Sequence, residues 1–147
     1  MDNKYNYPEL ERVDKDIGRF YKDSNNNLVP SVTTVLSNTS DKSVGLMDWR
    51  LRVGDEEANR VIKQSTDIGT SVHLAIENYL NNNEWSNFGS SYEERISEQI
   101  TKRFISDALK NITEVWGLEV GLILDNLYAG TADCVGMYSD VPSLIDF

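Results

Sequence analysis

Cysteine and histidine are almost absent from this sequence. Its 147 residues contain one cysteine, Cys134, and one histidine, His73. A single cysteine excludes an internal disulfide and a zinc site built from a cysteine cluster. A single histidine excludes a metal site built from several histidines and disfavours a Ser-His catalytic triad. The carboxylates are therefore the residues to examine for metal chemistry.

Long apolar runs are missing as well. No stretch of about 18 apolar residues occurs, which excludes a membrane-spanning helix and a membrane partner. Residues 1–12 are charged and lack the apolar core of a secretory signal. The length suits one domain with a substantial core, so we expect a soluble intracellular domain.

Basic residues are absent from the C-terminal quarter of the chain. All 14 lysines and arginines lie in residues 1–110, together with 18 acids, whereas residues 111–147 contain six acids and no base. The net charge of −10 argues against a nucleic-acid partner, because neutralising a phosphate backbone needs lysine and arginine. A carboxylate cluster that holds a metal ion would reverse the local charge.

Hydrophobic periodicity predicts helices followed by strands. A short hairpin with an Asx-rich turn is expected over residues 19–29, and residues 1–18 could be a loose arm outside a single domain of residues 19–147. Gly69 is expected to end one helix and Thr70 to cap the next. The predicted helices are a short one capped by Ser31, 44–53, one that begins at 55, 71–82 and about 91–111.

From Val115 the apolar period changes to two, which predicts a strand. Turns at 125–126 and 139–142 predict a second strand over 127–138 and a third that begins at Ser143. The expected fold class is therefore mixed α+β, or α/β, with N-terminal helices followed by an antiparallel β-meander.

Three acids lie inside these strands, namely Glu119, Asp133 and Asp146. A hairpin centred on Asn126 places Glu119 opposite Asp133, and one centred between 139 and 140 places Asp133 opposite Asp146. Opposed like charges destabilise a sheet, and Mg²⁺ or Mn²⁺ would remove that cost and suits phosphoryl chemistry. The alternative is a register shifted by one residue, which would turn one acid toward solvent.

His73 and Glu77 are spaced i, i+4 and share a helix face. His73 could be a fourth metal contact from a helix packed over the meander, or a histidine at the edge of the core. Arg50 and Lys102 could contact phosphates or belong to a solvated face. The three tryptophans, Trp49, Trp85 and Trp116, are expected in the core or at interfaces rather than as base-stacking platforms.

Four segments occur in an informative order. Residues 28–37 read L-V-P-S-V-T-T-V-L-S, residues 68–73 read I-G-T-S-V-H, residues 130–134 read G-T-A-D-C and residues 144–147 read L-I-D-F. Together they resemble the RecB-like branch of the PD-(D/E)XK nucleases, in particular phage exonucleases and the mitochondrial genome maintenance exonuclease. The resemblance covers about residues 28–147.

The resemblance implies a restriction-endonuclease-like core and a DNA exonuclease that depends on Mg²⁺ or Mn²⁺. It implies that Asp133 and Asp146 are metal ligands, and that His73 lies near the metal. It implies the same role for Glu119 by its place in the preceding strand rather than by a sharp motif. As a phage-type enzyme, the protein would act in the host cytoplasm on DNA, alongside replication or recombination proteins. The weaker candidates for DNA contacts are Thr70, Thr131, Arg50 and Lys102.

The family lysine is expected two residues after Asp146, and the sequence ends at Phe147. We therefore expect the N-terminal portion of a longer nuclease domain, incomplete at its C-terminus and inactive without the lysine that stabilises transition-state charge. Two alternatives stay open. One is a non-catalytic module that binds DNA ends or a replication protein, and the other is a helical interaction protein with an accidental motif match.

Overall fold

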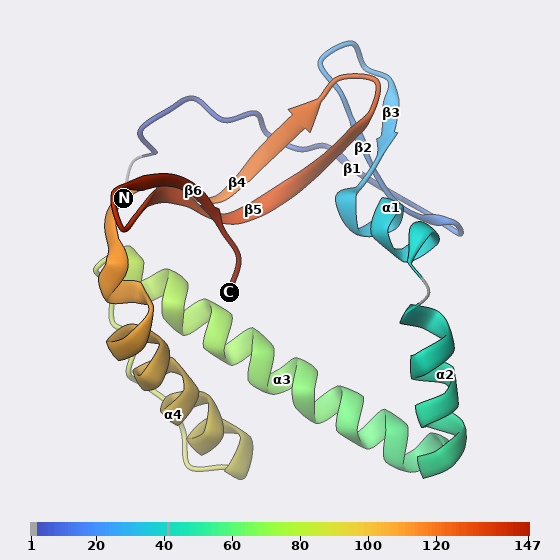
Figure 1. Cartoon of the computed structure of the whole chain (residues 1–147), viewed down its shortest axis with the longest axis vertical. Helices are drawn as coiled ribbons and strands as arrows, with labels where there is room; N and C mark the ends of the chain where they lie inside the picture. The colour runs from blue at the N-terminus through green and yellow to red at the C-terminus, as the bar shows by residue number, and fades with distance from the viewer. Residues whose placement is uncertain (1–2, 41) are drawn as a thin grey trace.

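The computed structural model describes residues 3–40 and 42–147. Over these residues the chain forms two three-stranded antiparallel sheets, with four α-helices lying between them in the sequence (Figure 1). The expected mixed α+β class is confirmed, whereas the restriction-endonuclease-like core stays a prediction. Within the described residues, every helix is too short or too polar to span a membrane.

The first sheet is built by the N-terminal hairpins. Its strands are β1 (Arg12–Lys15), β2 (Gly18–Lys22) and β3 (Leu28–Pro30), in that order. The hairpin expected over 19–29 is confirmed, with Tyr21 opposite Val29. The description of residues 1–18 as a loose arm is wrong for β1, because β1 pairs with β2 from Arg12 opposite Tyr21 onward. This sheet packs on the far end of the second sheet, where Tyr21 and Val29 bury Ala129.

The helices follow the expected order, and the break expected at Gly69 is corrected. They are α1 (Val32–Thr39), α2 (Lys42–Val53), α3 (Asp55–Leu80) and α4 (Tyr92–Asp107), followed by a 3₁₀ turn at Leu109–Asn111. The expected break at Gly69, with Thr70 as a new cap, is wrong because α3 continues through both residues. A helical glycine costs only about 1 kcal/mol relative to alanine. The buried face of α3, which carries Val72 and Ile76, offsets that cost.

Two helix starts show the capping chemistry that their sequences encode. The Ser31 side chain accepts a hydrogen bond from the backbone N–H of Thr34, which caps α1 as expected. Ser91 and Glu94 form a capping box at the start of α4. The helix expected to reach residue 111 ends at Asp107 and gives way to the 3₁₀ turn.

The second sheet is the expected meander. Its strands are β4 (Ile112–Leu124), β5 (Tyr128–Tyr138) and β6 (Val141–Ile145), in that order. Leu118 lies opposite Cys134, and Cys134 lies opposite Ile145 on the other side. Both turn centres inferred from the sequence are thereby confirmed, and the same registers bring residues 119 and 146 to the two sides of Asp133.

One core cluster joins α3 to this sheet. Val72, Ile76 and Leu80 of α3 pack with Leu109 and the fully buried Cys134. In Figure 1, α3 runs beneath the sheet, with α4 beside its C-terminal half. The face of α3 that buries these residues also carries His73 toward the strands that contain the three acids.

Candidate metal centre

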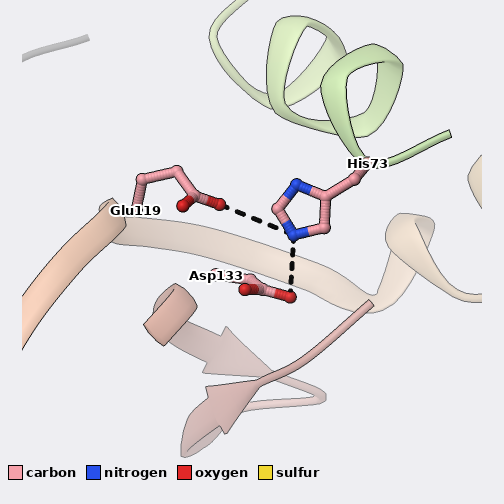
Figure 2. A group of neighbouring side chains, drawn as sticks. All are labelled: His73, Glu119 and Asp133. Atoms are coloured by element: carbon pink, nitrogen blue, oxygen red, sulfur yellow. Dashed lines mark ion pairs between the residues drawn. The ribbon is translucent and has the colours of Figure 1, made fainter. Parts of the chain in front are cut away.

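His73, Glu119 and Asp133 converge from α3, β4 and β5 (Figure 2). The Nε2 atom of His73 lies 3.0 Å from Oδ2 of Asp133 and 3.6 Å from Oε1 of Glu119. One potential ligand atom from each residue lies within 4.8 Å of the other two. In the part of the chain that the structure describes, this is the one group of three such side chains that could hold a metal ion.

The backbone at Glu119 is unusual for a strand. Its φ is +51°, whereas Leu118 and Val120 on either side keep the regular pairing with β5. A residue other than glycine in this conformation costs of order 1 kcal/mol, and such strain concentrates at functional sites. The strain accompanies a Glu119 carboxylate that points at His73 (Figure 2).

Asp133 is held by two neighbours. The backbone N–H of Phe147 donates a hydrogen bond of 3.0 Å to Oδ2 of Asp133, the same oxygen that contacts His73. The Phe147 ring also lies over His73, with 5.1 Å between ring centroids. Only 16% of the Asp133 side chain is exposed, so its position is well defined. The sequence contains no signal for the Phe147 contact, because any residue except proline could supply that N–H.

Asp146 lies next to this group rather than inside it. The charge of Asp133 raises the pKa of Asp146, with further contributions from a hydrogen bond between the two carboxyls and from burial, while His73 opposes the shift. Crowded like charges disfavour ionisation in this way. The strand register places Asp146 beside Asp133, but the group of His73, Glu119 and Asp133 does not include Asp146.

Glu119 experiences the same crowding from the other side. Burial raises its pKa, and the charges of Asp133 and Glu77 add to that effect, while His73 lowers it. Glu77 lies one turn after His73 on α3. The centre thus collects negative charge that its single imidazole does not balance.

An open hollow of about 550 Å³ adjoins the centre. Thr70 lines it, together with His73, Glu77, Glu119 and Phe147. No lysine or arginine of the described residues lines it.

The remaining candidates fall into two groups. Thr131 lines a second hollow that Glu119 also borders, so it lies near the centre. Arg50 and Lys102 are not brought there. Arg50 pairs with Asp55 at 2.6 Å at the junction of α2 and α3. Lys102 pairs with Glu98 at 2.7 Å on α4.

Comparison with known proteins supplies no relative for this chain. No family model, no curated protein and no solved structure matches it. The interpretation of the centre therefore rests on its own geometry and on the sequence motifs.

Proposed function

We propose that this chain is a divalent-metal-dependent DNA exonuclease, or the metal-binding portion of one, related to the RecB-like PD-(D/E)XK nucleases. The observation that carries the proposal is the convergence of His73, Glu119 and Asp133, with Nε2 of His73 at 3.0 Å and 3.6 Å from the two carboxylates. The order of the four motif segments along the chain supports it independently.

The donor set fits Mg²⁺ or Mn²⁺. Hard divalent cations prefer carboxylate oxygens, which Glu119, Asp133 and Asp146 offer within one small region. The charge of Asp133 is the main cause of the raised pKa of Asp146, and it adds to the effect of burial that raises the pKa of Glu119. A cation would relieve this crowding, so the ligands would be His73, Glu119 and Asp133, with Asp146 beside them.

A bound ion of this kind would polarise a phosphodiester and lower the pKa of a coordinated water. The chain's own residues would position the reactants. The Phe147 N–H and His73 fix the rotamer of Asp133, so the carboxylate is oriented before substrate arrives. Thr70 and His73 line the open hollow and would contact the phosphate that enters it.

The test combines thermal unfolding with cleavage. Titration with MnCl₂ or MgCl₂ should raise Tm, by about 5–10 °C at a hundredfold excess over Kd. A labelled oligonucleotide should be shortened only when the metal is present. Asp133→Ala should abolish both effects, whereas Asp16→Ala, which removes an exposed carboxylate from the β1–β2 turn, should abolish neither. Metal-dependent cleavage that survives Asp133→Ala would refute the assignment of the centre.

A second candidate is a non-catalytic module that binds DNA ends or a replication or recombination protein. The observation that favours it is the lack of any lysine or arginine, among the described residues, in the hollow beside His73. Without such a group, transition-state charge would have no stabilising side chain there. Metal-linked stabilisation with no cleavage of any oligonucleotide would support this function over the first.

A further inference from the structure

The α2 helix has no buried residue between positions 44 and 53. In Figure 1 it stands at the margin of the molecule, beside the N-terminal end of α3. A helix of 12 residues is only marginally stable in water by itself, and helices in proteins are stabilised mainly by burial of an apolar face. Because α2 obtains little burial within this chain, a partner that covers it would stabilise it.

An apolar stripe runs along α2. Val44, Met47 and Leu51 are spaced i, i+3, i+7, which places them on one face of the helix. Their exposed fractions are 61%, 65% and 74%. Amphipathic helices that dock into apolar grooves of other proteins use anchor residues at this spacing. The high exposure of all three side chains shows that no described part of the chain covers this face.

An apolar hollow of about 310 Å³ lies on the second sheet. Leu122, Leu124 and Tyr128, near the turn that joins β4 to β5, line it, and each is more than a third exposed. Val32 from α1 and Leu144 from β6 line it as well, and both are exposed. The apolar lining is therefore open to solvent, and it offers the kind of surface into which a helix stripe docks.

The charges on the two surfaces are opposite in sign. The charged residues that line the apolar hollow are Asp133 and Asp146. Residues 44–53 carry two arginines and one aspartate, although the chain as a whole has a net charge of −10. Both arginines lie in the last turn of α2, where Arg50 pairs with Asp55, so Arg52 is the base that can approach an acid of the hollow. Complementary charge of this kind favours one partner over others.

A second copy of this chain carries both surfaces. If the α2 helix of each copy enters the apolar hollow of the other, the two contacts are equivalent, as two-fold symmetry requires. Three aliphatic side chains alone supply far less than the roughly 800 Å² that a standard interface buries on each partner, and the reciprocal arrangement adds the hollow to the stripe on both chains.

We infer that this chain forms a two-fold dimer in which the stripe of Val44, Met47 and Leu51 on each α2 fills the apolar hollow of the second copy. The dimer goes beyond the proposed function and needs no metal ion.

Analytical ultracentrifugation of the whole chain in EDTA tests the dimer. The weight-average mass should rise from that of one chain toward that of two between about 1 µM and about 200 µM. Leu51→Glu places a charge in the stripe and Leu124→Glu places one in the hollow, so each should raise the Kd of the dimer at least about tenfold. Ile17→Glu alters a side chain that is 72% exposed between β1 and β2, and it should leave the Kd unchanged.

Mixing the two variants tests which surfaces meet. In a heterodimer of Leu51→Glu with Leu124→Glu, the altered stripe faces the altered hollow at one contact, while the intact stripe meets the intact hollow at the other. The mixture should therefore dimerise more readily than either variant alone at the same total concentration. Circular dichroism confirms that each variant is folded, and Tyr128→Glu replaces Leu124→Glu if the latter unfolds.

Three outcomes would overturn the dimer. The first is a monomer at every concentration up to about 1 mM, which would leave the stripe to a different protein. The second is a dimer that Leu51→Glu does not weaken. The third is a dimer that Leu51→Glu weakens and the hollow variant does not, with no gain on mixing, which is expected if α2 pairs with α2 of the second copy. The Mn²⁺-dependent rise in Tm is a separate measurement, so none of these results bears on the metal centre.

Discussion

Asp23, beside the first sheet, and Asp133, in the second sheet, both have little exposure, but their surroundings differ. Asp23 sits in the turn after β2 and is 6% exposed, yet its oxygens accept backbone N–H groups from Asn25, Asn27 and Asn126. Asp133 in β5 accepts one backbone N–H and is surrounded by further acids. The first carboxylate is satisfied by the chain itself. The second lies among acids without a lysine or arginine nearby among the described residues, and it is the acid that we propose binds a metal ion.

The pKa directions express the same contrast. Burial raises the pKa of Asp23, but the N–H donors of Asn126, Asn27 and Asn25 outweigh it and the net shift is downward. Around Asp133 the pKa values of Glu119 and Asp146 move upward. Folding therefore favours the charged form of Asp23 and disfavours charge at Asp146.

The largest effect should come from comparing alanine substitutions of the two aspartates. Asp133→Ala should remove the metal-linked rise in Tm, which is worth about 2.7 kcal/mol at a hundredfold excess of metal over Kd. Asp23→Ala should lower Tm in EDTA and keep that rise. Differential scanning calorimetry with and without MnCl₂ measures both. Equal loss of the metal-linked rise in both variants would contradict the assignment of metal binding to Asp133 rather than Asp23.

The next effect is the pH dependence of stability. Because the folded pKa of Asp23 is depressed, its contribution is present above its unfolded pKa and is lost as pH falls through the folded value. The Tm of the wild type should therefore fall more steeply at acid pH than the Tm of Asp23→Asn. At pH 7 the variant should be less stable than the wild type. Melting curves at a series of pH values from about 7 down to about 2.5 test this. Parallel curves for the two proteins would refute it.

Gly69→Ala should have a smaller effect, in the stabilising direction. A Cβ at Gly69 meets nothing within 4 Å, and the residue lies inside α3. Alanine should therefore raise stability by about 0.5–1 kcal/mol in urea unfolding. Gly69 lines the hollow of His73 but carries no charge, so the Kd for Mn²⁺ should be unchanged. A lower stability would indicate that the backbone at 69 is not helical in solution.

The smallest effect should be that of Asp146→Asn in the absence of metal. Removing one of the crowded charges should raise Tm by about 2 °C at pH 7. Since the folded pKa of Asp146 is raised, the advantage should shrink as pH falls and the wild-type carboxyl is protonated. Saturating Mn²⁺ should reverse the order of the two proteins. A variant that is less stable than the wild type in EDTA would argue against charge crowding at Asp133.

Sequence reasoning succeeded where one local rule controls the outcome. The turn chemistry at 125–126 and 139–142 set the centres of both hairpins, and those centres alone align residue 119 and Asp146 with Asp133. Ser31 was found as a helix cap for the same reason, since its side chain acts on the next turn. Register and capping depend on a few adjacent residues.

Other features depend on contacts between distant segments. The rule that glycine interrupts a helix failed at Gly69 because burial of Val72 and Ile76 elsewhere on α3 outweighs it. The positive φ of Glu119 has no signature in a strand sequence. The packing of Tyr7 against Gly117 and of Pro8 against Gly121 could not be predicted either, because these residues are far apart in the sequence.

The unbroken course of α3 has a mechanical consequence. At about 1.5 Å per residue, the helix is a rod of about 39 Å, and His73 is carried on it while the carboxylates belong to the sheet. The centre is therefore divided between a helix and a sheet that one buried cluster joins. An ion bound by both would act as a cross-link between them, and hydrogen exchange in α3 and β5 should slow together when it binds.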